Sequence, residues 1–570
     1  MRPARLLTPR ATQPFAAGAV RLGDVEVACS LVESGCGMRL DWCVRNPGRR
    51  TVKLDRVGLG IDVDRAVERV LEHGWQSWSV VRRCRPDDVR AQRRRLPAWR
   101  RASAFADPVR AGKAVTGEPF LVTDGGVVGF LAGARHLSVV EAAPEGDGVV
   151  GWALLDGVPL AAGEERFLDP MWWATGDPGR LYSQYAAAFG VQAGARAATP
   201  TPPGWCSWYH YRSAVTPADV LANAGAARAA GLCVIQIDDG YQAGIGDWLT
   251  GREAWAQGTA PVAKALLDKG LRPGIWTAPF LVDEGGSVAG DHPGWLCLDR
   301  RAGRPVRVMH NPRWWGGWAL ALDTTHPGVL DHLRETFATL AGQGFDYHKV
   351  DFLYAGAVPA RRHDSAMTRA QALRAGLEAV RDGIGGGAFL AGCGSPFGPA
   401  VGMVDAMRVS TDVAPWWAPR RTRPGMEEAA SCARHAVVTS LLRAPLHRRL
   451  WANDNDCLLL RGDDTELEPW QRRMVAAAVA GGGGFVMVGD DMTGYGDDER
   501  QLLARTLSVL PSADAPLDLV DPFGADLTVR SAAYELVAAA DGEAALLSRG
   551  DEPGTEEVVI DARAARLRRR

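Results

Sequence analysis

Two charged side chains, Lys349 and Asp351, lie two residues apart in a run that is otherwise mainly aromatic and β-branched, residues 345–352. Such a run, bounded by Gly344 and Gly356, is typical of a short buried strand. Because side chains alternate along a strand, both charges would point to the same face. In a parallel β/α barrel that face is either the packed interior, where burying charges is costly, or the mouth of the active site. Taken alone, a structural ion pair explains the two residues equally well.

Similar chemistry recurs where other predicted strands end. Six of eight strand-like segments finish in side chains that could meet a polar ligand: Asp238 and Asp239, Trp276, Lys349 and Asp351, Cys393, Arg408 and Asp412, and Asn453 with Asp454. The carboxyl ends of the strands form the catalytic face of a barrel. A purely structural role is disfavoured, because so many acids at one rim would mostly repel one another.

Several carboxylates with tryptophans nearby, and no cluster of metal ligands, indicate glycoside hydrolysis. That reaction needs one ionised carboxylate and one protonated partner across the scissile bond. Asp351 suits the nucleophile, since the neighbouring Lys349 would favour its charged form. Asp412 follows Arg408 but lies beyond the end of its strand, and this loop position suits a mobile acid/base.

The elements that must position these residues begin near residue 203, where strand-like and helix-like segments start to alternate. Eight such units over roughly 300 residues predict a (β/α)8 TIM barrel. The strand candidates are residues 205–209, 233–239, 273–280, 345–352, 388–394, 406–412, 449–454 and 485–491. A helix is expected to open at Thr216-Pro217, and another at Thr325-His326-Pro327.

Short alternating runs before the barrel, broken by Gly, Pro and Asp, predict an N-terminal antiparallel β-sandwich. A linker with three prolines at residues 194–203 separates it from the barrel. Strand-like runs at 517–520 and 556–560 suggest a small C-terminal β-domain. The predicted boundaries are therefore residues 1–197, 198–511 and 512–570.

Two tryptophan-bearing segments lie outside the barrel strands. Residues 73–79 have neither a strand nor a helix period, so their indoles, including Trp78, either pack onto the sandwich or reach the neighbouring pocket. The second segment is an insertion before the Lys349 strand, which contains Trp295, Trp314, Trp315 and Trp318. An arginine-rich stretch, residues 82–101, is typical of a solvated surface.

The composition limits the classes of function. The 570 residues are 46% hydrophobic with a formal net charge of −2, so neither nucleic acid nor a membrane is expected as a partner. Ten scattered cysteines without a C-x-x-C spacing argue against a zinc site and a disulfide framework, and we expect no metal and no cofactor. The amino-terminal residues lack an apolar signal segment and no stretch approaches a membrane span, which predicts a cytoplasmic protein.

Several motifs together resemble those of the melibiase-type α-galactosidases of glycoside hydrolase family 36. They are Trp205-Cys206-Ser207-Trp208-Tyr209, Asp238-Asp239-Gly240-Tyr241-Gln242 with Gly246-Asp247-Trp248, Lys349-x-Asp351 and Arg408-x-Ser410-x-Asp412. Residues 451–456 are similar to a Trp-x-Asn-Asp-Pro-Asp pattern of the same clan, and residues 73–79 resemble its N-terminal loop. Tyr241 stands where Trp is usual and Asn455 where Pro is usual; these departures bear on specificity more than on activity.

The resemblance implies a retaining, exo-acting α-galactosidase that acts on oligosaccharides. It makes Asp351 the nucleophile and Asp412 the acid/base, and it places Asp238 and Asp239 on galactose hydroxyls. It surrounds the sugar ring with Lys349, Arg408, Cys393, Trp208, Tyr209 and Trp276, and Trp78 is added as a candidate from the N-terminal loop. Retention requires the two catalytic carboxyl groups to lie about 5–5.5 Å apart.

Three alternatives stay open. A transglycosidase of the raffinose-synthase kind would use the same pair of acids, and another α-glycoside, such as an α-N-acetylgalactosaminide, could be the substrate. A non-catalytic sugar-binding protein is less favoured, because a binder needs neither Asp351 nor Asp412. The natural oligosaccharide and the oligomeric state do not follow from the sequence.

Overall fold

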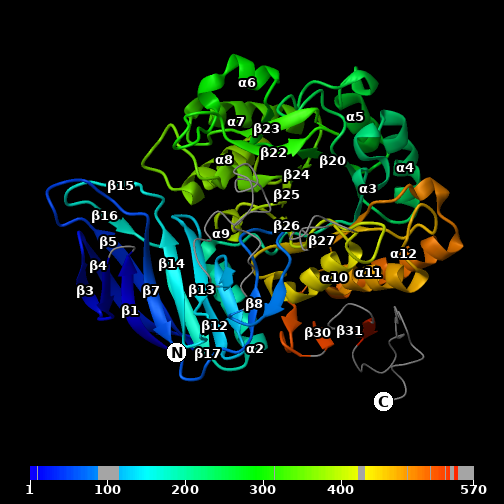
Figure 1. The fold of residues 1–570 in the computed structure, drawn as a ribbon. Coiled ribbons are helices and arrows are strands. Elements are labelled where there is room, and N and C mark those ends of the chain that lie inside the picture. The colour runs from blue at the N-terminus through cyan, green and yellow to red at the C-terminus, as the bar shows by residue number, and fades with distance from the viewer. Residues whose placement is uncertain are drawn as a thin grey trace.

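The computed structural model describes residues 1–8, 11–87, 115–313, 315–420, 431–483, 485–513, 515–524, 526–532, 534–539 and 545–549. A domain of antiparallel sheets lies beside a closed parallel barrel, and a small antiparallel sheet follows the barrel near the C-terminus (Figure 1). This architecture confirms the predicted TIM barrel with an N-terminal β-sandwich and a small C-terminal β-domain.

The N-terminal domain consists of two main antiparallel sheets. The first contains β1 (Arg2–Thr8), β2 (Ala11–Pro14), β7 (Arg56–Asp62), β10 (Val115–Gly117), β13 (Leu137–Ala142) and β14 (Gly148–Leu154). The second contains β3 (Gly18–Leu22), β4 (Val25–Ser34), β5 (Gly37–Arg45), β8 (Val70–Glu72), β9 (Arg82–Cys84), β11 (Phe120–Thr123), β12 (Gly126–Phe130), β16 (Glu165–Phe167) and β17 (Met171–Thr175), and β6 (Val52–Lys53) pairs with β15 (Pro159–Leu160).

Side-chain alternation explains why these sheets pack face to face. In β4 the side chains of Val25, Val27 and Cys29 are buried, while the intervening residues are partly exposed. They join a core that includes Leu59 of the first sheet and Leu121 of the second. The apolar faces of the two sheets therefore enclose one hydrophobic layer, as a sandwich requires.

Helix α2 (Pro178–Ala193) leads from the sandwich to the barrel. The side chain of Asp177 caps its first turn, Pro178 occupies the first position, and Gly194 ends it in a left-handed conformation with φ 66°. Gly190 lies so close to the barrel that an added Cβ atom would meet the carbonyl oxygen of Arg449 at 2.0 Å. The helix is therefore packed tightly between the two domains.

The barrel closes from eight parallel strands. In order they are β18 (Gly204–Cys206), β19 (Val234–Ile237), β20 (Arg272–Thr277), β24 (Tyr347–Val350), β25 (Phe389–Gly392), β26 (Ala406–Arg408), β27 (Ala452–Leu458) and β28 (Phe485–Val488). Each lies within or overlaps one of the eight predicted segments. One detail was wrong: Trp208 and Tyr209 do not extend the first strand but begin a short helix, α3 (Trp208–Tyr211).

Helices and an inserted sheet surround the barrel (Figure 1). The helices are α4 (Pro217–Ala229), α5 (Ala260–Asp268), α6 (Ser287–Asp291), α7 (Pro327–Gly342), α8 (Arg369–Ile384), α9 (Phe397–Ala400), α10 (Ala433–Leu442), α11 (Pro469–Gly481) and α12 (Asp497–Ala513). Short 3₁₀ turns are η2 (Arg212–Ala214), η3 (Glu253–Trp255), η4 (Pro293–Trp295), η5 (Leu353–Ala357), η7 (Ala444–Leu446) and η8 (Met492–Gly494). The insertion between β20 and β24 forms a sheet of β21 (Leu281–Asp283), β22 (Arg307–Asn311) and β23 (Gly317–Ala321).

Both predicted helix starts are confirmed. Thr216 caps α4 through a reciprocal pair of hydrogen bonds with Asp219, and Pro217 takes the first helical position. His326 caps α7 before Pro327.

The C-terminal sheet contains β29 (Asp518–Leu519), β30 (Asp526–Arg530), β31 (Tyr534–Ala539) and β32 (Ala545–Arg549). The Tyr534 hydroxyl donates to the carbonyl oxygen of Gly481 at 2.9 Å and ties this sheet to α11. The predicted strand at 556–560, Trp314 and residues 88–101 of the arginine-rich stretch lie outside the described residues, and the domain boundaries stay predictions. Among the helices that the structure describes, none combines the length and the apolar character needed to cross a bilayer.

Candidate active site

A pocket of about 100 Å³ opens at the carboxyl ends of the barrel strands. It is lined by Trp78, Trp208, Tyr209, Asp238, Asp239, Trp276, Asn311, Trp315, Lys349, Asp351, Phe352, Arg408 and Asp412. The lining contains every predicted site residue except Cys393, which lies behind it in contact with Trp78. The structure thus brings together in one pocket residues that are separated by more than 300 positions in the sequence.

Three lining residues were not predicted as site residues: Asn311, Trp315 and Phe352. The first two come from the tryptophan-rich insertion. Its composition could have indicated a role in sugar binding, but it does not show which indole faces the pocket. Phe352 directly follows Asp351, and its place in the lining depends on a backbone turn that the sequence does not display.

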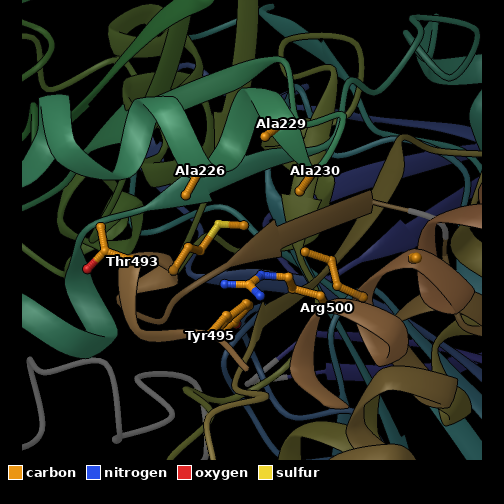
Figure 2. Close-up of a pocket in the computed structure, with 9 residues that line it drawn as sticks. Ala226, Ala229, Ala230, Thr493, Tyr495 and Arg500 are labelled. Carbon is orange, nitrogen blue, oxygen red and sulfur yellow. The ribbon is translucent and has the colours of Figure 1, made fainter. Parts of the chain in front are cut away.

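A larger cavity, about 470 Å³, lies between α4, η8 and α12 (Figure 2). Ala226, Ala229 and Ala230 contribute one side of it, and Tyr495 and Arg500 contribute polar groups. Arg500 is the one charged side chain in its lining, so this cavity lacks the paired carboxyl groups that acid/base chemistry requires. The smaller pocket is therefore the candidate active site.

Asp351 is held in one orientation by two donors. The chain leaves β24 at Val350, and the Trp276 indole Nε1 donates to Asp351 Oδ2 at 2.9 Å. The backbone N–H of Phe352 donates to Oδ1 at 2.8 Å. Both carboxylate oxygens thus accept hydrogen bonds from fixed donors, and the side chain is held in one orientation in the pocket lining.

The sequence predicts that Lys349 pairs with Asp351, but in the structure its ion-pair partner is Asp238. Lys349 Nζ lies 3.0 Å from Asp238 Oδ2, so its ion pair crosses the barrel mouth to the strand end of β19. Two side chains on the same face of a strand need not touch, and the long lysine side chain reaches the more distant acid. This acid raises the pKa of Lys349 well above its ordinary value even though burial acts in the opposite direction. Lys349 is therefore a buried cation.

Asp238 and Asp239 both line the pocket because the backbone turns directly after them. Gly240 has φ 132°, and a Cβ atom there would lie 2.7 Å from the backbone of Ser213. Asp239 accepts from Gln242 Nε2 at 2.6 Å and from Trp315 Nε1 at 2.9 Å. Burial nevertheless raises the pKa of Asp239 to about 6.

Arg408 is the centre of a second cluster of charges. Its guanidinium lies 2.7 Å from Asp456 Oδ1, 3.2 Å from Asp412 Oδ1 and 3.4 Å from Asp454 Oδ2. Asp456 also accepts from the hydroxyl of Tyr209 and from the backbone N–H of Val413, the latter at 2.7 Å. These contacts anchor the residue that follows Asp412, and they hold the start of its loop against the barrel.

Asp412 itself is more accessible than the rest of this cluster. Its side chain is 46% exposed, whereas the Arg408 side chain is 3% exposed. Loss of solvation next to the surrounding protein is the main cause that raises the pKa of Asp412 to about 6, and the nearby carboxylate of Asp456 is the second. Arg408 acts in the opposite direction. A carboxyl group with these properties can carry a proton near neutral pH and can be reached from the pocket.

The N-terminal loop reaches the pocket, which the sequence left open. Trp78 Nε1 donates to Cys393 Sγ at 3.0 Å, and the backbone N–H of Ser77 donates to the carbonyl oxygen of Ser395 at 2.9 Å. The buried guanidinium of Arg443 donates to the carbonyl oxygens of Ser77 at 2.5 Å and His73 at 2.8 Å. The loop is therefore bonded directly to the barrel.

The two departures from the family pattern lie outside the pocket lining. The hydroxyl of Tyr241 donates to the carbonyl oxygen of Trp276 at 3.1 Å, behind the pocket wall. Asn455 is buried and donates to the carbonyl oxygen of Ala478 at 3.3 Å.

Comparisons with known proteins find similarity to α-galactosidases. The Melibiase family model matches residues 212–376. The α-galactosidase AgaA of Geobacillus stearothermophilus is 30% identical over 129 residues, 21% of this chain and 16% of that protein. An α-galactosidase of Escherichia coli is 25% identical over 144 residues, 24% of this chain and 18% of that protein. The aligned regions thus span less than a fifth of either curated relative.

Similarity to solved structures extends over almost the whole chain. An α-galactosidase from Thermus thermophilus in complex with p-nitrophenyl α-D-galactopyranoside has a TM-score of 0.71 and 25% identity, covering 94% of this chain and 98% of that one. The same enzyme in complex with stachyose has a TM-score of 0.70 and 26% identity, covering 89% of this chain and 99% of that one. The family 36 enzyme AgaA of Geobacillus stearothermophilus has a TM-score of 0.62 and 18% identity. The match covers 94% of this chain and 76% of that one, and it shows a shared fold.

Proposed function

Because this chain is a relative of the melibiase-type α-galactosidases of glycoside hydrolase family 36, we propose that it is an exo-acting, retaining α-galactosidase. The observation that carries the proposal is the pairing of two unlike acids in one pocket. Asp351 is held by two hydrogen-bond donors, whereas Asp412 is half exposed and has a pKa raised to about 6. Two carboxyl groups with different environments are what a glycosidase needs for its two roles.

The proposed reaction has two steps. Asp351 attacks the anomeric carbon of a terminal α-galactoside, and Asp412 gives its proton to the glycosidic oxygen as that bond breaks. The products are a β-linked galactosyl–Asp351 ester and the free alcohol. Asp412, now ionised, takes a proton from water as the water attacks the anomeric carbon, which releases α-galactose and restores both acids.

The remaining pocket residues would bind the galactosyl group. Asp238 and Asp239 would accept from its hydroxyls, while the buried cation Lys349 pairs with Asp238 and the buried cation Arg408 pairs with Asp456. Trp208, Tyr209 and Trp276 would complete the enclosure, with Cys393 behind it. A pocket of about 100 Å³ suits one terminal sugar rather than an internal unit of a chain, which supports the exo mode.

The ligands of related structures suggest substrates to try. The Thermus thermophilus enzyme was solved with p-nitrophenyl α-D-galactopyranoside and with stachyose, and a variant of the Geobacillus enzyme was solved with raffinose. We extend this to the present chain as a proposal that its substrates are terminal α-galactosides of this kind. Its cytoplasmic location and the absence of nucleic-acid, membrane, metal and cofactor partners stay predictions.

Release of p-nitrophenol from p-nitrophenyl α-D-galactopyranoside tests the activity. Proton NMR of the first product tests retention: α-galactose should form first, and early β-galactose would show inversion. Asp351→Asn should abolish turnover. Asp346→Asn is the matched control, because Asp346 is 51% exposed, pairs with Arg272 and precedes the same strand. Equal loss in both variants would contradict a specific role for Asp351.

A further inference from the structure

The pocket has two layers that differ in burial and chemistry. Trp276 and the charged groups other than Asp412 form a buried floor, which consists of Asp238, Asp239, Trp276, Lys349, Asp351 and Arg408. Above them lie half-buried aromatic side chains, among them Trp78, Trp315 and Phe352. If the floor holds the terminal sugar, as the proposed function requires, whatever is attached to that sugar must lie against the aromatic layer.

Phe352 occupies this layer in a strained conformation. It directly follows Asp351 and has φ 54° and ψ 32°, in the left-handed region that aromatic residues rarely adopt. The backbone beyond it is bonded to the loop that follows β25, with Tyr354 N 2.6 Å from the carbonyl oxygen of Gly394. Strain of this kind persists where the surrounding structure enforces it, and it often marks a functional site.

The ring of Phe352 is clamped between two indoles from distant parts of the chain. Its centroid lies 5.0 Å from that of Trp78 at an interplanar angle of 90°, and 5.1 Å from that of Trp315 at 69°. Each indole is fixed in turn: Trp78 donates to Cys393 Sγ and Trp315 donates to Asp239. The N-terminal domain, the inserted sheet and the β24 loop thus combine in one rigid aromatic surface beside the nucleophile.

We propose that Trp78, Phe352 and Trp315 form a binding platform for the leaving group, and that Phe352 is the residue that selects a hexopyranose there. This inference rests on the proposed function and deepens it by naming the class of leaving group. Flat apolar faces of aromatic rings suit the apolar face of a pyranose. Phe352 directly follows Asp351 and lines the same pocket, so the platform adjoins the bond that breaks.

The test compares two substrates that share the galactosyl group. Melibiose has a glucose leaving group that would contact the platform, whereas α-galactosyl fluoride has a leaving group with no ring. The measured quantity is the ratio of kcat/KM for melibiose to kcat/KM for the fluoride. Dividing by the fluoride value removes effects on Asp351 and on the galactose site.

Three substitutions separate the ring from the backbone. Phe352→Ala removes the ring and keeps the left-handed strain, Phe352→Gly removes both, and Phe352→Tyr keeps the ring. We expect both Phe352→Ala and Phe352→Gly to lower the ratio about fivefold or more, and Phe352→Tyr to keep it within about twofold. Phe167→Ala is the control, since Phe167 is 62% exposed on β16 of the sandwich.

Each outcome is decisive. If the wild-type protein hydrolyses neither substrate, the proposed function itself fails. If it hydrolyses the fluoride but not melibiose, or if the ratio is unchanged in both ring-less variants, the platform is refuted. A ratio that falls in Phe352→Ala but not in Phe352→Gly assigns the effect to the backbone and also refutes it, and melting temperatures of all variants report any loss of folding.

Discussion

The pKa of Asp412, raised to about 6, predicts how the activity depends on pH. If Asp412 is the general acid, its protonated form is required to break the glycosidic bond. A group with this pKa is about nine-tenths protonated at pH 5, about one-tenth at pH 7 and about one-hundredth at pH 8. We therefore expect kcat/KM for melibiose to fall about tenfold from pH 5 to pH 7 and about ninefold more by pH 8.

Replacing the acid should remove this dependence. In Asp412→Asn the amide oxygen can still accept from Arg408, so the loop should keep its position. General acids contribute about 10²–10⁴-fold to such reactions, so hydrolysis of melibiose should fall by that factor. The loss should be far smaller for α-galactosyl fluoride, whose leaving group needs little protonation. With α-galactosyl fluoride as the substrate, azide should speed turnover by attacking the galactosyl ester in place of water, and the product should be α-galactosyl azide.

Asp239 provides the discriminating control, because burial raises its pKa to about 6 as well. Its carboxylate accepts from Gln242 and Trp315 and would bind the sugar rather than donate a proton. Asp239→Asn should therefore lower kcat/KM at every pH while keeping the decline above pH 6. Asp412 is not the general acid if the wild-type profile is flat from pH 5 to pH 8, if the decline persists in Asp412→Asn, or if it disappears in Asp239→Asn.

Three further outcomes are expected. Asp351→Ala should abolish turnover, and azide should then attack the substrate directly to give β-galactosyl azide; an α-configured azide product or near-normal activity would defeat the nucleophile assignment. Asp238→Asn and Asp239→Asn should each lower kcat/KM for an aryl α-galactoside relative to the α-glucoside without a large change in melting temperature, and unchanged selectivity in both would contradict their role in recognition. Lys349→Met should destabilise the fold by about 3–5 kcal/mol, because it leaves the buried Asp238 carboxylate unpaired, and adding Asp238→Asn should recover part of that loss in thermal unfolding.

The barrel could be predicted from the sequence because its strands are short apolar runs that end in chemistry-bearing residues. Local patterns also placed the caps of α4 and α7. Patterns of this kind do not reveal which partner a long side chain chooses, and Lys349 bonds to Asp238 rather than to its neighbour on the same strand. Trp208 and Tyr209 fit a strand locally, yet the chain bends into α3 where the barrel ends.

The parts of the site that were missed depend on contacts between distant segments. Trp315 enters the pocket because the inserted sheet folds over the barrel mouth, and its neighbours in the sequence look equally suited to that role. Phe352 enters the pocket because its backbone has a positive φ. Glycine is the usual residue in that conformation, so a phenylalanine at this position gave no indication of it. Asn311 carries no distinguishing pattern at all.

Arg443 links the sandwich to the barrel through hydrogen bonds to both. Its buried guanidinium donates to carbonyl oxygens of His73 and Ser77 in one domain and of Val409 in the other, and none of the acids that the structure describes forms an ion pair with it. Excision of the N-terminal domain would leave the Arg443 donors that now bond to His73 and Ser77 without acceptors, and it would also remove Trp78 from the pocket. The barrel is therefore a poor candidate for use as a minimal stand-alone catalyst, and proteolytic separation of the domains should end catalysis even if the barrel strands stay paired.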